Sequence, residues 1–441
     1  MKSTIATKSR GGRARLLGLA AAATLAATIA PGATAQGSLK VGIVGFYTGA
    51  AAGPFGIPAR NAAELVIEAM NAGKVPAPYQ SAGAGGLQID AVYIDESGGT
   101  AKVVTDYRNA VQRQGVEAFV GYISSGSCLA IAPVAEELAT FTILFDCGTP
   151  RIFEDASYTY VFRTAATATM DGVGAARYVA AKFPDIKNYQ GINQNYAWGQ
   201  DSWRDFELAM KALLPNAKSE DSLFPKLFAG QYGAEISSLS VKRPNVLHSS
   251  LWGGDLESFV LQSSARALNR QTTMILTTGE TTMFRLGSKL PDGIILGARG
   301  PYGVYARDSE LNTWFRNAYQ DRFATPPTYP SYQMAQALLG LKIAYDKAAT
   351  AAGGSKPTSA QAADGLAGAE YEAFGTTVKM ALGNGRQAIT ETAYGLSKFD
   401  KETGTATITD IIRFPAECVN PPDGAKSVEW IQGGMQGAKC D

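Results

Sequence analysis

Segments typical of β-strands alternate with segments of helical periodicity over residues 39–150, and this alternation restricts the possible folds most strongly. Expected strands cover residues 39–46, 87–94, 119–123 and 140–145. Between them, apolar residues recur every three or four positions, and the two clearest helical runs stop at Gly73 and Gly115. The pattern predicts an α/β fold with a doubly wound parallel sheet.

Each of these strands is followed by a polar turn, at Thr48, Ser97, Ser125 and Thr149. Ligands of parallel sheets bind beyond the carboxyl ends of the strands, so we expect these turns to share one edge. Residues 124–127 (SSGS) stand between a strand and a helix, where backbone N–H groups and the helix dipole favour an anion such as a carboxylate. Simple N-capping by Ser124 or Ser125 is the alternative.

The alternation begins again after residue 164, which predicts a second α/β lobe. Expected helices cover 172–183 and 201–214, and expected strands cover 189–193, 246–252, 273–277 and 293–296. Further helices are expected at 308–323 and 331–349, a loop at 352–358 and a last strand at 406–414. We expect an irregular, disulfide-tied C-terminal segment over 414–441.

The first 35 residues have the pattern of a secretory signal peptide. The basic residues Lys2, Lys8, Arg10, Arg13 and Arg15 precede a short Ala/Leu-rich run over 16–29 and the sequence PGATA at 31–35. A basic end, a short apolar run and an Ala-x-Ala site predict export with cleavage near Ala35. A membrane anchor is the alternative, although the run is short for a bilayer.

The composition is that of a globular protein large enough for two domains. Of 441 residues, 46% are hydrophobic and 18% charged, and the formal net charge is +1. This balance argues against a nucleic-acid partner. Four cysteines in an exported chain suggest disulfides, and we favour Cys128–Cys147 and Cys418–Cys440 among the three possible pairings because each closes a short loop. A reactive thiol is the alternative.

The sequence lacks the motifs that would indicate an enzyme. His248, in an expected strand, is the one histidine, and no Gly-x-Ser-x-Gly elbow or phosphate-binding loop is present. No cluster of histidines and cysteines has metal-ligand spacing. We therefore expect neither catalysis nor a cofactor or metal, and we expect His248 to pack within the sheet.

Six short stretches, in their order and spacing, resemble the periplasmic solute-binding proteins of the leucine/isoleucine/valine type, which serve ABC importers. They are KVGIVGFYTG at 40–49, NAAEL at 61–65, GYISSGSCLA at 121–130, YVFRT at 160–164, YAWG at 196–199 and WGG at 252–254. The resemblance implies two lobes joined by three crossings near 161–164, 295–299 and 397–401. Lobe 1 would comprise 36–162 and 297–398, and lobe 2 would comprise 163–296 and 399–441.

The resemblance also implies which residues contact a ligand between the lobes. Ser124, Ser125, Cys147 and Thr149 would hold a carboxylate and the adjoining α-amino end, and Glu280 would receive an ammonium group. The walls would come from Phe55, Tyr122, Tyr196 and Trp198, and Asp255 stands where an aromatic residue is common.

Each of these assignments has a structural alternative. Tyr196 and Trp198 could be packing residues at a strand end, Glu280 a solvated turn residue, and Asp255 a helix cap. We expect Arg163 to tie the hinge rather than meet a ligand.

The implied function is that of an extracytoplasmic solute-binding protein. It would be a periplasmic monomer that captures an amino acid or a related small carboxylate or amide and delivers it to an ABC-transporter permease in the inner membrane. A module of the same fold that senses amides or amino acids and signals to a partner is the alternative.

Overall fold

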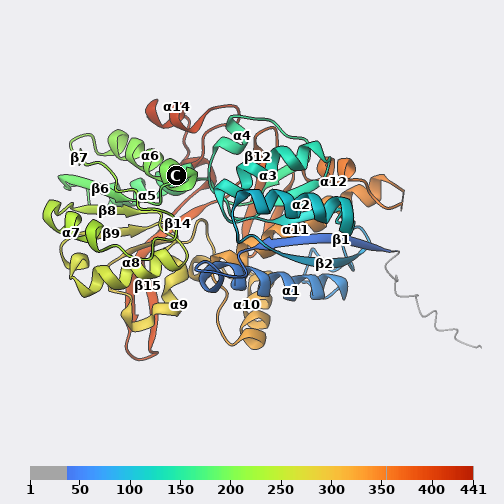
Figure 1. Ribbon diagram of the computed structural model, residues 1–441, viewed down its shortest axis with the longest axis horizontal. Coiled ribbons are helices and arrows are strands. Elements are labelled where there is room, and N and C mark those ends of the chain that lie inside the picture. Colours follow the sequence, from blue (N-terminus) through green and yellow to red (C-terminus); the bar gives the residue numbers. More distant parts are fainter. Residues whose placement is uncertain (1–36, 354, 441) are drawn as a thin grey trace, which may run out of the picture. The chain divides into compact units, whose positions relative to one another are not determined.

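The computed structural model describes residues 37–353 and 355–440. This part of the chain forms two α/β lobes, each a mixed sheet with helices on both faces (Figure 1). The expected signal peptide, residues 1–35, lies outside the described residues. Among the helices in the described part, none is long and apolar enough to cross a membrane.

The first lobe contains an eight-stranded sheet in the order β11-β12-β13-β5-β4-β3-β1-β2. The pairs β2–β1, β1–β3, β3–β4, β4–β5 and β5–β13 are parallel, whereas the hairpin strands β11, β12 and β13 pair antiparallel. The strands are β1 (Ser38–Gly45), β2 (Gln88–Asp95), β3 (Ala118–Gly121), β4 (Phe141–Leu144), β5 (Val161–Arg163), β11 (Glu370–Ala373), β12 (Thr376–Leu382) and β13 (Gln387–Ile389).

Helices cover both faces of this sheet, which explains why most residues of its central strands are apolar. One face packs on α2 (Thr100–Gln114) and α3 (Ser125–Glu137) through Tyr107 and Ile131, and the other packs on α1 (Ile57–Asn71) and α11 (Tyr329–Ala351). The remaining helical segments are η1 (Ala52–Gly56), α4 (Arg151–Glu154), η5 (Gly303–Tyr305), α10 (Glu310–Phe323) and α12 (Ser359–Leu366).

The second lobe contains a seven-stranded sheet in the order β15-β14-β10-β9-β8-β6-β7. Its strands are β6 (Asn188–Ile192), β7 (Lys218–Ser219), β8 (Val246–Ser249), β9 (Thr273–Leu276), β10 (Ile295–Gly297), β14 (Thr392–Asp400) and β15 (Thr405–Phe414). In Figure 1, α5 (Ala168–Lys182) and α6 (Ala197–Leu213) cover one face, and α7 (Gly233–Lys242) and α8 (Gly254–Ala265) cover the other. Short helical segments η2 (Leu268–Arg270), η3 (Gly279–Thr282), α9 (Met283–Leu286) and η4 (Gly287–Lys289) complete this lobe.

The chain passes between the two sheets after β5, after β10 and after β13. We expected the third crossing at 397–401, but β14 already pairs antiparallel with β10 of the second sheet. The crossing therefore lies between Ile389 and Thr392, and residues 392–398 belong to the second lobe instead of the first. Burial explains why these residues join the second lobe, because the first half of β14 is buried beside β10.

The polar turns after the first four strands do share one edge, as the alternation predicted. The hydroxyl of Ser97 donates to the carbonyl of Thr48 at 3.0 Å, and the backbone N–H of Thr149 donates to Ser125 Oγ at 3.2 Å. Residues 124–127, called the serine turn below, therefore lie at the carboxyl edge of the first sheet, where ligands of parallel sheets bind.

Both expected cysteine pairs are disulfide bonds in this structure, Cys128–Cys147 and Cys418–Cys440. The second bond closes a C-terminal segment that includes α13 (Ala416–Val419) and α14 (Ser427–Gln432). This segment packs on α5 and α6 of the second lobe. It also reaches the first lobe, because Glu417 pairs with Lys379 at 3.0 Å and the backbone N–H of Ser427 donates to Glu154 at 3.1 Å.

Replacing both Cys418 and Cys440 by alanine is expected to lower the free energy of unfolding by about 3 kcal/mol, the usual effect of opening a loop of this size. The two cysteines are 22 residues apart. Urea unfolding of the variant measures this loss, and hydrogen exchange should show faster exchange in α13 and α14. Exchange in those helices as slow as in the unaltered protein would contradict the tying role of the disulfide.

Candidate functional site

A cavity of about 10 Å³ lies where the carboxyl ends of the two sheets meet. It is large enough for about one water molecule. The first lobe, the second lobe and the second crossing all contribute to its lining, which consists of Phe55, Ile123, Ser125, Asp146, Gly148, Tyr196, Trp198, Trp252, Thr278, Arg299 and Tyr329.

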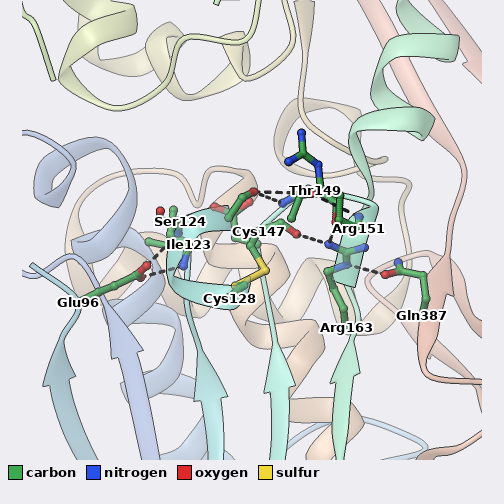
Figure 2. Close-up of a disulfide and its surroundings, with 12 residues drawn as sticks. Glu96, Ile123, Ser124, Cys128, Cys147, Thr149, Arg151, Arg163 and Gln387 are labelled. Atoms are coloured by element: carbon green, nitrogen blue, oxygen red, sulfur yellow. Dashed lines mark hydrogen bonds between the residues drawn. A yellow bond between two sulfur atoms is a disulfide. The ribbon is translucent and has the colours of Figure 1, made fainter. Parts of the chain in front are cut away.

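The serine turn already holds a carboxylate, and it belongs to the protein (Figure 2). Glu96, one residue beyond β2, accepts the backbone N–H groups of Ile123 at 2.8 Å and Ser124 at 2.9 Å. The prediction that Ser124 offers its N–H group to a ligand carboxylate is wrong, because Glu96 already accepts from that group. The acidic residue follows the neighbouring expected strand, but no local sequence pattern distinguishes it from an external anion as the partner of these N–H groups.

Glu96 is 1% exposed, and its burial governs its ionisation. Burial raises the pKa of Glu96 to about 7, although the N–H groups of Ile123 and Ser124 act in the opposite direction.

Ser125 faces the cavity, as expected, while Thr149 and Cys147 are committed to the protein. The Ser125 oxygen accepts the N–H groups of Gly148 and Thr149, each at 3.2 Å, which leaves its proton to donate toward the cavity. The hydroxyl of Thr149 donates to Asp201 at 2.6 Å. The backbone carbonyl of Cys147 accepts from Arg163 at 3.0 Å. Neither Thr149 nor Cys147 lines the cavity.

Three of the four expected aromatic residues line the cavity, and the fourth does not. Phe55, Tyr196 and Trp198 are among the lining residues. Tyr122 has a φ of 74° and packs into the core between the first sheet and α2, where it is 1% exposed. Its assignment as a wall residue is therefore wrong, because the left-handed backbone at this position directs the chain differently from an extended strand.

Trp252 and Tyr329 also line the cavity, although the sequence analysis named neither of them as a ligand contact. The ring of Phe55 packs edge-on against both, with centroid distances of 5.2 Å and 5.5 Å. The indole N–H of Trp252 donates to the hydroxyl of Tyr196 at 2.8 Å. The hydroxyl of Tyr329 is buried without a hydrogen-bond partner. These contacts join rings of both lobes around the cavity.

Trp198, at the start of α6, approaches the first lobe at Gly148. Its indole N–H donates to the carbonyl of Ser250 at 2.9 Å, which sets the orientation of the ring. A β-carbon at Gly148 would lie 2.2 Å from Trp198 Cζ3, far inside van der Waals contact. Glycine at position 148 is therefore required for this approach of the two lobes.

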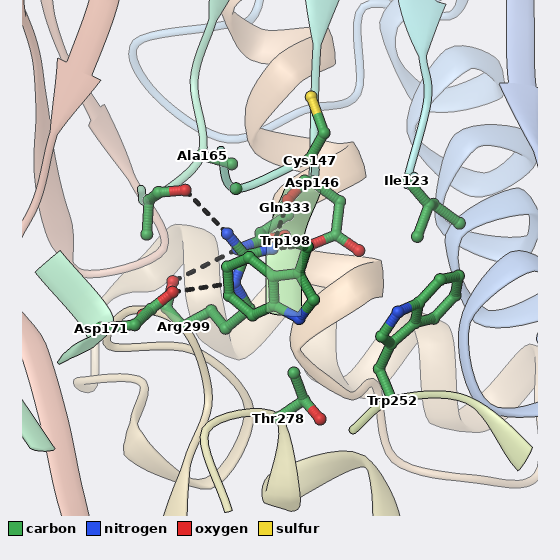
Figure 3. Close-up of polar contacts among 12 residues, drawn as sticks. Ile123, Asp146, Cys147, Ala165, Asp171, Trp198, Trp252, Thr278, Arg299 and Gln333 are labelled. Carbon is green, nitrogen blue, oxygen red and sulfur yellow. Dashed lines mark hydrogen bonds and ion pairs between the residues drawn. The ribbon is translucent and has the colours of Figure 1, made fainter. Parts of the chain in front are cut away.

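Arg299 is the central residue of the site that sequence reasoning missed (Figure 3). Its guanidinium donates to Asp171 at 3.0 Å and to the carbonyl of Ala166 at 2.7 Å, and it forms an ion pair with Asp146. The face of Trp198 lies 4.4 Å from the guanidinium carbon. Arg299 lies on the second crossing and therefore connects it to the end of β4, to the first crossing and to α5.

Arg299, Asp146 and Asp171 form a buried cluster, which carries more negative than positive charge when both carboxyl groups are ionised. Burial raises the pKa of Asp146 and that of Asp171 to about 6 each, although the nearby Arg299 lowers both. Burial alone would lower the pKa of Arg299, but Asp171 and Asp146 outweigh it and raise that pKa above its ordinary value. One oxygen of each carboxyl group, Asp146 Oδ2 and Asp171 Oδ1, is buried without a partner.

Glu280 and Asp255 are both buried away from the cavity lining. Glu280 accepts the backbone N–H of Tyr329, the first residue of α11, at 2.9 Å, and so links η3 of the second lobe to the first lobe. Asp255 accepts from Gln194 and from the N–H groups of Phe228 and Gly230, at 2.7 to 3.0 Å. Their contacts hold protein segments, contrary to the ligand contacts that we expected.

The titration of Glu280 predicts a measurable pH dependence of stability. Burial raises its pKa to about 8, against the lowering effect of the Tyr329 and Val304 N–H groups. Between about pH 4.5 and pH 8, the folded protein keeps a proton that the unfolded chain loses. The free energy of unfolding therefore falls as pH rises, by at most about 1.4 kcal/mol per unit from this group.

Glu280→Gln removes this titration and keeps an acceptor for Tyr329. We expect its urea-unfolding stability to fall less steeply from pH 5 to pH 8 than that of the unaltered protein. Glu402→Gln, at an exposed turn, serves as the control. Equal slopes for Glu280→Gln and the unaltered protein would count against the assignment.

Arg163 and His248 lie where the sequence analysis expected them. Arg163 is fully buried and bonds to Gln387, beside the third crossing, at 2.5 Å (Figure 2) and to the carbonyls of Cys147 and Thr149. His248 lies in β8, stacked on Phe206 at 4.3 Å, and burial lowers its pKa to about 3.

The sequence model of a family described as periplasmic binding protein matches residues 38–400. The match covers most of the chain, and the chain belongs to the periplasmic binding protein family. No curated protein sequence matches the chain.

Solved structures with the same fold include several solute-binding proteins of ABC transporters. One from Rhodopseudomonas palustris BisB5, in complex with 3,4-dihydroxybenzoic acid, has a TM-score of 0.74 and 17% identity, over 86% of this chain and 98% of that one. A leucine binding protein from Thermotoga maritima MSB8 has a TM-score of 0.70 and 16% identity, over 85% and 98%. At such identities the likeness establishes the shared fold alone.

Proposed function

We propose that this protein is the extracytoplasmic solute-binding component of an ABC importer. It captures an amino acid or a related small carboxylate or amide between its two lobes and delivers it to a membrane permease. The observation that supports this most is the position of the cavity, at the carboxyl ends of both sheets and beside the crossings that join the lobes. Membership of the periplasmic binding protein family supports a location in the periplasm.

The side chains around the cavity suit a small solute with one polar end and an apolar body. Ser125 and Tyr329 offer hydroxyl groups, and Asp146 offers a carboxylate oxygen without a partner. The rings of Phe55 and Trp252 supply apolar walls. Binding sites for small molecules commonly combine mostly apolar walls with a few well-placed polar groups.

Entry of a solute requires the lobes to move apart, because the present cavity of about 10 Å³ holds no amino acid. The three crossings are the places where such a hinge motion can occur. A solute that binds both lobes stabilises the closed arrangement relative to the open one.

A thermal-shift screen of the purified protein against amino acids, amides and aromatic acids tests the proposal. We expect at least one solute to raise the unfolding temperature in a concentration-dependent way, since binding to the folded state alone stabilises it. Native mass spectrometry of protein purified without denaturation should show the same solute bound once per chain. Failure of every solute in both measurements would contradict the proposal.

A sensor of the same fold is the second candidate, because the same cavity would serve it. Genetic deletion separates the two functions. Loss of solute uptake supports the importer, whereas normal uptake with loss of a transcriptional or motility response supports the sensor.

A further inference from the structure

An anion entering the cavity would find free hydroxyl donors on Ser125 and Tyr329, but the one cationic residue of the described lining, Arg299, is already paired with two carboxyl groups. Glu96 occupies the N–H groups of Ile123 and Ser124. The guanidinium of Arg299 uses Nε, Nη1 and Nη2 on Asp171, Asp146 and the carbonyl of Ala166. Buried charges require partners of opposite charge, so a carboxylate placed here would lack a free cationic partner among the lining residues.

An acceptor, in contrast, is free. Asp146 Oδ2 is buried without a hydrogen-bond partner, in a residue that is 1% exposed and lines the cavity. Figure 3 shows this oxygen turned away from Arg299 and toward the space between Trp198 and Trp252. A buried carboxylate oxygen without a donor is costly, and a donor on the solute would satisfy it.

Aromatic rings surround the same space. Five of the lining residues are aromatic, namely Phe55, Tyr196, Trp198, Trp252 and Tyr329. The negative face of an aromatic ring attracts a cation, and groups of such rings bind ammonium ligands. One lining ring already does this within the protein, because Trp198 stacks on the Arg299 guanidinium.

From this arrangement we infer that the site recognises a compact cationic nitrogen, an ammonium or alkylammonium head, through Asp146 and the surrounding rings, and that a carboxylate on the solute is not required. The inference rests on the proposed function, since the solute must enter between the lobes. With the solute bound, the charges of Asp146, Asp171 and Arg299 would be balanced by one further positive charge.

Matched solutes test the ammonium group and the carboxylate of an amino acid separately. Isothermal calorimetry on the unaltered protein would compare leucine with 3-methylbutylamine, which lacks the carboxylate, and with 4-methylpentanoate, which lacks the amine. Phenylalanine, 2-phenylethylamine and 3-phenylpropanoate form a second set, and tetramethylammonium and choline test the head alone. We expect that in at least one set the amine binds within tenfold of the best solute and the acid binds at least a hundredfold more weakly than that solute. Alternatively, tetramethylammonium or choline itself binds within tenfold of the best solute.

An acid that binds as well as its amino acid, while the matching amine does not bind, would overturn this inference and leave the proposed function intact. The same holds if the wider thermal-shift screen finds only solutes without a cationic nitrogen. If no solute of any class binds, the inference fails together with the proposed function.

Two variants test the roles of Asp146 and the rings. Asp146→Asn is expected to weaken amine binding at least a hundredfold, whereas Glu402→Gln, at an exposed turn away from the lining, should change it less than threefold. Because Asp146→Asn also alters the contact with Arg299, Trp252 provides an independent test. Trp252→Leu should weaken amine binding about tenfold and Trp252→Phe should restore most of it. Unchanged amine affinity in both Asp146→Asn and Trp252→Leu would refute the assignment.

Discussion

Arg299→Met is expected to lower the free energy of unfolding by about 3–5 kcal/mol, because removing one partner of a buried ion pair leaves the other uncompensated. Here one guanidinium serves two carboxyl groups, Asp146 and Asp171, with the arginine 4% exposed and each carboxyl side chain 1% exposed. Methionine keeps much of the length of the arginine side chain but none of its donors. Urea unfolding followed by circular dichroism measures the loss.

A rescue experiment distinguishes the stability lost through unbalanced charge from the stability lost through altered packing. When Asp146→Asn and Asp171→Asn are added to Arg299→Met, the buried negative charges disappear, and we expect most of the lost stability to return. Arg299→Lys should recover only part of it, since an ammonium group cannot donate in the planar arrangement that reaches Asp146, Asp171 and Ala166 together. A triple variant no more stable than Arg299→Met would contradict the electrostatic explanation.

Gly148→Ala is expected to weaken solute binding tenfold to a hundredfold, with a smaller effect on the stability of the solute-free protein. The added methyl group would lie 2.2 Å from Trp198 Cζ3 and 2.6 Å from Arg299 Nη2. Overpacking of this kind costs about 1–3 kcal/mol, and separation of the lobes relieves the contact with Trp198 of the second lobe. That part of the cost therefore falls on the closed, solute-bound state. Calorimetry with the tightest-binding solute of the screen measures the change.

Gly126→Ala is the matched control for this prediction. Gly126 lies in the serine turn, which contacts Gly148 through the Ser125 hydroxyl, but a β-carbon at Gly126 would meet only Ser124 Oγ, at 3.6 Å, an ordinary contact. We expect its solute affinity to stay within threefold of the unaltered protein. If Gly148→Ala binds as tightly as Gly126→Ala, the close approach of Trp198 to the first lobe is not part of the bound state.

Most of the architecture could be predicted because hydrophobic periodicity reflects burial in a layered fold. Strands such as β1 and β4 are largely buried and consist mostly of apolar residues, whereas α2 shows one apolar face. The hairpin β11–β13 and the start of β14 were missed. The strands β11 and β13 have only four and three residues, and β11 and β12 alternate between more and less buried positions. No local sequence feature indicates which sheet these strands or β14 join.

The site was only partly predictable, because its contacts join residues far apart in the chain. Ser125, Phe55 and Trp198 followed from the strand ends and the family resemblance. Arg299 meets Asp146 and Asp171 across separations of 153 and 128 residues, and no local pattern indicates that pairing. The same limit applies to Glu96, which could not be recognised as the carboxylate at the serine turn until both strands were placed.

Small-angle X-ray scattering with and without the tightest-binding solute tests most directly whether the two lobes close on a small molecule. We predict that the radius of gyration of the unaltered protein decreases on addition of the solute, and that Gly148→Ala shows a smaller decrease at the same occupancy. An unchanged radius of gyration in the unaltered protein at saturating solute would contradict closure.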